Sequence, residues 1–111
     1  MPVISIIIPT LNEEAHLHRL LGEVAQACAG VSYELVVVDA ASQDRTVAIA
    51  REHGARVVET VAGNRGHQLR LGAQHSQGQY LWFVHADGQL AAQPDLGQRL
   101  IDALETGAVA A

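Results

Sequence analysis

The stretch QYLWFVHADG, residues 79–88, is an apolar run that stops abruptly at a histidine, an acid and a glycine. Its shortness, its aromatic and β-branched side chains and the flanking glycines predict a strand that is buried on both faces. In open parallel α/β sheets, ligands bind beyond the carboxyl ends of the strands, so polar side chains at that end face a site. The stretch therefore predicts a buried strand of a parallel sheet and one side of a ligand site.

His85 and Asp87 lie two residues apart at the end of this predicted strand. In an extended segment, residues at that spacing point to the same side, so the two side chains could together hold one divalent cation. A plain turn at Asp87-Gly88, beside a strand-end histidine that has its own partners, explains the same residues. The pattern alone leaves both interpretations open.

Apolar segments and helical patterns alternate along the rest of the chain. Buried strands are predicted for residues 3–8 and 34–39, and a shorter edge strand for 56–61. Four helices are expected, beginning near residues 12, 44, 64 and 94 and ending near 30, 53, 76 and 107. Residues 108–111 resemble the start of a fifth strand. This order predicts an α/β domain over residues 1–111, a mostly parallel open sheet with helices on both faces.

Local signals refine the expected boundaries. Pro9 should end the first strand, because proline cannot donate a hydrogen bond to a neighbouring strand. Thr10 or Asn12 should cap the first helix, and Ser42 or Asp44 the second. In the third helix, Leu69, Gly72, Ala73 and Ser76 share one stripe, and the small residues among them should let the helix lie close to the sheet.

Composition excludes several classes of function. Seven arginines and no lysine stand against 12 acids, and the formal charge of −5 argues against a general binder of nucleic acid or anionic membranes. Cys28 is the only cysteine, which excludes an internal disulfide and a cysteine-based zinc site. The apolar run at residues 3–8 is too short for a signal sequence or a membrane span, so we expect a cytoplasmic protein.

Three predicted strand ends should meet at one edge of the sheet: the loop after Ile8, Asp39, and His85 with Asp87. Carboxylates there could bind hydroxyl groups and a cation, and helix N-termini with Arg65 could bind an anion. This combination suits a sugar nucleotide, whose diphosphate a divalent cation at Asp87 would neutralise. The glycine-rich motifs of dinucleotide-binding folds and of P-loops are both missing.

Three motifs in this order resemble a known family. They are IIIPTLNEE at residues 6–14, VVDAASQDRT at 37–46 and LWFVHAD at 81–87. Together they are similar to the three signatures of the family 2 glycosyltransferases, enzymes with the GT-A fold. The histidine-alanine-aspartate form of the last motif, with Arg65 and Gln68 ahead of Gly72, is similar to the radical-SAM/selenodomain-associated transferase branch.

The resemblance implies roles for the first two motifs. Pro9, Asn12 and Glu13 would line the nucleotide pocket, and Asp39 would accept a hydrogen bond from the base or ribose of the donor. A strand terminator, a helix cap and a helix-dipole partner explain the first three residues equally well. Asp39 is harder to explain in that way, because it directly follows four apolar residues at the ligand edge.

The third motif would supply the metal. By resemblance, Asp87 is the metal-bridging acid of an Asp-x-Asp-type motif with His85 at its first position, and the cofactor is Mn or Mg. Arg65 would approach the phosphates, although a solvated arginine at a helix start is an alternative. The family usually has a glycine-rich or acidic pair where this chain has Ala40-Ala41, so the tight turn must be made with Cβ atoms present.

The implied reaction is an inverting, metal-dependent transfer of a sugar from a nucleotide-diphosphate sugar to a hydroxyl acceptor. Family members continue further and carry a later carboxylate base, whereas the acids after Asp87, namely Asp95, Asp102 and Glu105, fall on the fourth expected helix. The chain therefore looks like the nucleotide-binding half, from which we do not expect full turnover.

Two other functions remain open: a non-catalytic nucleotide-binding module and a plain α/β interaction module. The sheet itself suggests a further property. Without a fifth strand, an apolar sheet edge beside the fourth strand would be exposed. Such an edge favours pairing with another copy, which predicts a homodimer or a higher assembly.

Overall fold

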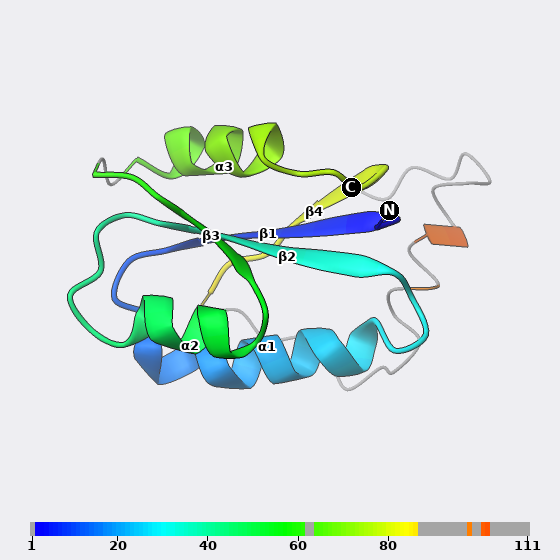
Figure 1. Ribbon diagram of the computed structural model, residues 1–111, viewed down its shortest axis with the longest axis horizontal. Helices are drawn as coiled ribbons and strands as arrows, with labels where there is room; N and C mark the ends of the chain where they lie inside the picture. Colours follow the sequence, from blue (N-terminus) through cyan, green and yellow to red (C-terminus); the bar gives the residue numbers. More distant parts are fainter. Residues whose placement is uncertain (1, 62–63, 87–97, 99–100, 103–111) are drawn as a thin grey trace.

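The computed structural model describes residues 2–61, 64–86, 98 and 101–102. Its elements are, in order, β1 (Ile4–Thr10), α1 (Glu14–Ala27), β2 (Tyr33–Asp39), α2 (Thr46–Glu52), β3 (Arg56–Glu59), α3 (Arg65–Gln74) and β4 (Tyr80–Phe83). The strands pair in parallel in the order β3-β2-β1-β4. Helices α1 and α2 lie on one side of the sheet and α3 on the other (Figure 1). The predicted α/β class is confirmed.

Parts of the C-terminal prediction lie outside the described residues. Of the expected fourth helix, residues 98, 101 and 102 are described and are helical, and Ile101 is buried against the core on the α1 side. The other residues of that helix and the expected strand at 108–111 are not among those described. Within the described ranges, no helix has both the length and the apolar character needed to cross a membrane.

The sheet separates two apolar clusters. On the α1 side, Ile4, Ile6 and Ile8 of β1 pack against the predicted stripe of α1, which is formed by Leu17, Leu20, Leu21 and Val24. Ile7 faces the opposite side, where it packs with Val36 and Val38 under α3. Cys28 belongs to the first cluster, and burial raises the pKa of its thiol to about 11, which leaves it an inert core residue.

Strand β1 runs through Pro9 to Thr10, so the prediction that Pro9 ends the strand is wrong. The carbonyl groups of Val3 and Ile7 accept hydrogen bonds from the N–H groups of Tyr80 in β4 and of Val84 directly after it. Pro9, two residues further on, has its backbone turned to that same side, beyond the last β1–β4 pair, Ile7 with Phe83. No partner strand is described there, so the missing N–H of proline costs the sheet no hydrogen bond.

The expected caps of the first two helices are only partly right. Helix α1 begins after Glu13, whose side chain makes no cap. Neither expected residue caps the helix, because Thr10 is still in β1 and the Asn12 side chain accepts a hydrogen bond from the loop after β2. At α2, the N-cap residue is Arg45, which makes no side-chain cap, although the carboxylate of Asp44, one residue earlier, accepts from the first N–H of the helix at 2.9 Å. Ser42 does not cap α2, because its hydroxyl donates to a neighbouring acid.

Strand β4 has one exposed face, so the prediction of a strand buried on both faces is wrong. Leu81 and Phe83 are 42% and 46% exposed. Phe83 lies next to Ile7 in the sheet and therefore on the α3 side, but α3 packs over β1 and β2. Tyr80 and Trp82 point the other way and pack against the α1-side core. These side chains are exposed because β4 is the end strand of the described sheet and α3 does not cover it.

Helix α3 lies very close to the sheet at Gly72, as the small residues of its stripe predict. A Cβ atom added at Gly72 would lie 2.3 Å from Cγ2 of Ile7 and 3.1 Å from Cγ2 of Val38. The first distance is shorter than any ordinary carbon–carbon contact. Only glycine therefore lets the helix dock at this height above β1 and β2.

Replacing Gly72 tests this close contact. We expect Gly72→Ala to lower the free energy of unfolding by about 1–3 kcal/mol, because the added methyl group overpacks the interface with Ile7. Gly22→Ala in α1 is the matched control, since a Cβ at Gly22 has no atom within 4 Å. That change should raise stability by about 0.5–1 kcal/mol in urea unfolding. Equal effects of the two variants would contradict the docking argument.

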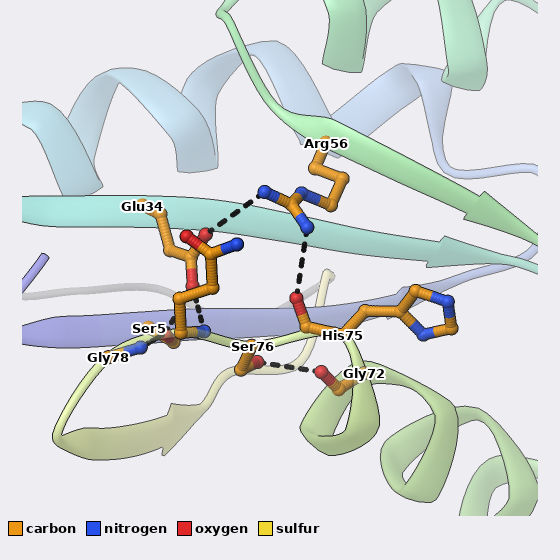
Figure 2. A network of polar contacts seen from close by, with 8 residues as sticks. Ser5, Glu34, Arg56, Gly72, His75, Ser76 and Gly78 are labelled. Carbon is orange, nitrogen blue, oxygen red and sulfur yellow. Dashed lines mark hydrogen bonds and ion pairs between the residues drawn. The ribbon is translucent and has the colours of Figure 1, made fainter. Parts of the chain in front are cut away.

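A polar network at the amino ends of the strands ties the sheet to the α3–β4 connection (Figure 2). The Glu34 carboxylate accepts from the Ser5 hydroxyl at 2.6 Å and from the Gln77 N–H at 2.6 Å, and Arg56 lies 4.0 Å away. The Ser5 hydroxyl in turn accepts from the N–H of Gly78 at 2.8 Å. Burial raises the pKa of Glu34, but these hydrogen bonds and the Arg56 charge outweigh it, so the pKa is lowered.

This lowered pKa makes stability depend on pH. Because the folded pKa of Glu34 lies below the unfolded one, its contribution is complete above the ordinary glutamate pKa of about 4.3. The contribution is lost as the pH falls through the folded pKa. We expect Glu34→Gln to flatten the loss of stability between about pH 5 and pH 3, measured by urea unfolding. Glu52→Gln removes a carboxylate from an exposed ion pair with Arg45, and as the control it should change stability at pH 7 by less than about 0.5 kcal/mol.

Candidate functional site

The carboxyl ends of β1 and β2 are joined at a buried carboxylate. Asp39, the last residue of β2, is 0% exposed and lies beside Thr10, the last residue of β1. Its Oδ1 accepts hydrogen bonds from the hydroxyl groups of Thr10 at 2.7 Å and of Ser42 at 2.6 Å. Its Oδ2 accepts from the backbone N–H of Ser42 at 2.8 Å. Asp39 is therefore the point at which two strands and the following loop meet.

These contacts give Asp39 a structural role at the predicted ligand edge. A carboxylate has about four acceptor positions, and three of those on Asp39 are used within the chain. A direct contact between Asp39 and a nucleotide stays a prediction. The sequence predicts helix caps for Thr10 and Ser42 and places both in the family motifs, but it does not predict their hydrogen bonds to Asp39. The sequence signal for this pairing is that Thr10, Asp39 and Ser42 all fall at the predicted carboxyl edge of the sheet.

The loop after β1 is held by the loop after β2. The N–H of Asn12 donates to the Ser42 hydroxyl at 2.8 Å, and the Asn12 side-chain oxygen accepts from the N–H of Gln43 at 2.8 Å. Asn12 has φ 54° and Ala41 has φ 58°. Asparagine tolerates this left-handed conformation, whereas alanine adopts it at a cost. The turn after Asp39 is thus made with a Cβ atom present, as the alanine pair predicts.

Two N–H groups at the start of α1 bind side chains near the start of α2. The N–H of Glu13 donates to the Thr46 hydroxyl at 2.8 Å, and the N–H of Glu14 donates to Asp44 at 3.2 Å. In return, the Glu14 carboxylate accepts from the N–H of Arg45 at 3.1 Å. The starts of α1 and α2 therefore hydrogen-bond to each other through these three N–H groups, and anion binding at either N-terminus stays a prediction.

Among the elements in the described part of the chain, α3 also starts at this edge. Asn64 caps it by accepting from the N–H of His67 at 2.9 Å. Arg65, the first residue of the helix, extends to β4, where its guanidinium contacts Nδ1 of His85. Both side chains are exposed. The structure thus brings together two of the predicted site residues, from elements that are 20 residues apart in the chain.

Only part of the predicted metal site can be located. His85 follows β4 at the carboxyl edge, but Asp87 lies outside the described residues. Among the residues that are described, no group of three or more histidines, cysteines or acids is arranged to hold a metal ion. Pro9, the other predicted pocket residue, is buried in β1. The cation therefore stays a prediction at this point.

A separate cleft of about 630 Å³ opens at the opposite end of the sheet. Its lining comes from the amino ends of β2 and β3 and the end of α2, and comprises Tyr33, Glu34, Leu35, His53, Gly54, Ala55 and Arg56. None of the predicted site residues lines it. In parallel sheets, ligands bind at the carboxyl ends, so this cleft is not the candidate site.

The Asp39 contacts can be tested by an isosteric change. We expect Asp39→Asn to lower the free energy of unfolding by about 1–3 kcal/mol, because the amide would turn an N–H₂ group toward a buried donor. Glu59→Gln at the exposed end of β3 is the control and should change stability by less than about 0.5 kcal/mol in urea unfolding. If Asp39→Asn lowered the free energy of unfolding no more than the control, the conclusion that these three hydrogen bonds stabilise the edge would be wrong.

The chain matches the family model "Glycosyl transferase family 2" over residues 5–111. It is 39% identical over 94 residues to 4,4'-diaponeurosporenoate glycosyltransferase from Staphylococcus haemolyticus, an alignment that covers 78% of this chain and 24% of that protein. The radical-SAM-associated branch is not identified by this match.

Two of the solved structures whose fold is similar to that of this chain contain a nucleotide sugar. S. aureus TarS 1–349 in complex with UDP-GlcNAc matches with a TM-score of 0.75 and 28% identity, over 92% of this chain and 30% of that one. The mannosyltransferase PcManGT from Pyrobaculum calidifontis, in complex with GDP-Man and Mn²⁺, gives 0.76 and 25%, over 94% and 32%. The chain thus spans about a quarter to a third of these proteins. By its sequence match and its fold, the chain belongs to glycosyl transferase family 2.

Proposed function

We propose that residues 1–111 bind the nucleotide-diphosphate sugar donor of a glycosyltransferase that transfers the sugar to a hydroxyl acceptor. The observation that carries this proposal is the meeting of Arg65 and His85 at the carboxyl edge of a parallel sheet. Ligands of open parallel sheets bind at that edge, and α3 starts there with its positive end. TarS with UDP-GlcNAc and PcManGT with GDP-Man support a donor of this class.

Arg65 would bind the diphosphate. Its guanidinium has donors in a planar fork that match phosphate oxygens, and it is exposed at the start of α3. The contact with His85 keeps it at the end of β4, facing away from the core. In this chain without lysine, an arginine is the residue type that can supply a permanent positive charge to the leaving diphosphate.

We further propose that a divalent cation, Mn or Mg, binds next to this arginine. Nδ1 of His85 accepts from Arg65, so a metal would bind a ring nitrogen of His85 only after Arg65 turns from it to the diphosphate, and Asp87 would add a carboxylate. Imidazole and carboxylate together are suitable ligands for Mn²⁺. When bound, the cation would neutralise charge on the departing diphosphate. PcManGT was solved with Mn²⁺ and its donor, which supports this assignment.

The remaining parts of the prediction concern the whole enzyme. We propose an inverting reaction whose catalytic base and acceptor site are supplied by residues other than the described ones. A homo-oligomer through an exposed sheet edge stays part of the proposal: β4 is the end strand of the described sheet, and it carries the exposed apolar side chains of Leu81 and Phe83. Membership of the radical-SAM/selenodomain-associated branch and a cytoplasmic location stay predictions from the sequence.

Calorimetric titration with UDP and with GDP, each with and without Mn²⁺, tests the donor site. We expect one nucleotide to bind, more tightly with Mn²⁺, and Arg65→Ala to weaken its binding at least about tenfold, because charge-assisted hydrogen bonds to phosphate are lost. Asp87→Ala should remove the metal dependence.

Arg19→Ala is the matched control for the loss of a positive charge, because Arg19 pairs with Glu23 on the exposed side of α1. It should leave the affinity unchanged. Binding that is equally strong in wild type and Arg65→Ala would contradict the assignment of the phosphate site. Binding without sugar transfer in any longer form of the chain would favour a non-catalytic nucleotide-binding module.

A further inference from the structure

Gln68 is a buried polar residue in the first half of α3 for which the proposed function has given no role. It is 5% exposed and lies on the sheet-facing side of the helix. Its side-chain nitrogen donates to the backbone carbonyl oxygens of Thr10 at 3.1 Å and of Val38 at 2.9 Å. Both N–H groups of the amide are therefore used, one on each of the two central strands.

The chemistry of this contact requires an amide. A carbonyl oxygen has two lone pairs, and the Thr10 carbonyl also accepts from the N–H of Ala40 at 3.0 Å. Gln68 thus adds a second hydrogen bond to a strand end that is already paired. A glutamate of the same shape would face these oxygens without a donor, and a methionine would make no hydrogen bond at all. The main effect of the contact is therefore to fix α3 to β1 and β2, since the Thr10 carbonyl already has a hydrogen-bond partner in the sheet.

The contact lies one helical turn from Arg65. Residues three apart on a helix lie on neighbouring positions of its surface, so Gln68 anchors the turn from which Arg65 extends. Gly72, four residues further on, is pressed against Ile7 and Val38. Helix α3 is therefore docked at two points, and Gln68 is the one nearer the proposed phosphate site.

We infer that Gln68 is a positioning residue that holds Arg65 where the diphosphate of the donor would lie. This inference rests on the function proposed above. An arginine on an unanchored helix start loses conformational entropy when it binds phosphate, and this loss weakens binding. An arginine whose helix is already anchored loses less entropy on binding. Removing the anchor should therefore weaken the recognition of the phosphates and leave the recognition of the nucleoside unchanged.

Gln68→Met tests the inference, because it keeps the length of the side chain and removes both donors. We expect it to weaken binding of UDP or GDP, whichever the wild type binds, at least about fivefold, and to change binding of the matching nucleoside less than about twofold. Ser76→Ala is the matched control, since it removes a side-chain hydrogen bond to a carbonyl, Gly72 at 2.6 Å, at the far end of α3. Equal losses for nucleotide and nucleoside would overturn the inference.

A double-variant cycle shows whether Gln68 acts through Arg65. In an Arg65→Ala background, Gln68→Met should cause no further loss of nucleotide affinity. Additive losses would mean that Gln68 acts independently of Arg65, and the inference would be wrong.

A second measurement needs no nucleotide. NMR spectra of the imidazole ¹⁵N nuclei should show the His85 signals shifted by Gln68→Met in the same direction as by Arg65→Ala. The signals of His18 and His53, whose rings contact each other away from this edge, should not move. Unchanged His85 signals would overturn the inference. If the wild type binds neither UDP nor GDP, the proposed function fails, while these spectra still decide whether Gln68 positions Arg65.

Discussion

The hydrogen bond between the Thr10 hydroxyl and the buried Asp39 carboxylate joins the ends of the two central strands, and the candidate site depends on it. The strands pair in parallel from Ile4 with Tyr33 to Thr10 with Asp39, so the two residues arrive side by side. A buried carboxylate needs partners, and Thr10 and Ser42 supply three hydrogen bonds. The loops that follow β1 and β2 consequently start from one fixed point, and hydrogen bonds join the starts of α1 and α2.

The third helix uses the same strand ends from the other side of the sheet. Gln68 reaches the carbonyl groups of Thr10 and Val38, and Gly72 lets the helix lie against Ile7. The first turn of α3 is thereby fixed over the carboxyl edge, where Arg65 contacts His85 at the end of β4. Elements from both halves of the chain therefore contribute to one polar edge, while the cleft at the other end of the sheet contains none of the predicted site residues.

The sequence pattern predicted those features of the fold that depend on residues close together in the chain. The stripe of α1, the buried strand that ends at Asp39 and the close approach at Gly72 all follow from the spacing of apolar and small residues. Other features depend on neighbours that are distant in the chain. Pro9 continues β1 because no described strand lies on that side of it, and Leu81 is exposed because α3 covers β1 and β2 instead of β4. The partners of Asn12 lie about 30 residues away, beyond the reach of any local pattern.

The central claim is that the carboxyl edge at Arg65 and His85, and not the cleft at the amino ends of β2 and β3, receives the nucleotide. Paramagnetic broadening of backbone amide NMR signals by Mn²⁺ in the presence of UDP or GDP tests it most directly. The account predicts that the broadened signals include those of Arg65 and His85 and exclude those of Tyr33 and Arg56. Broadening centred on Tyr33 and Arg56 would contradict it.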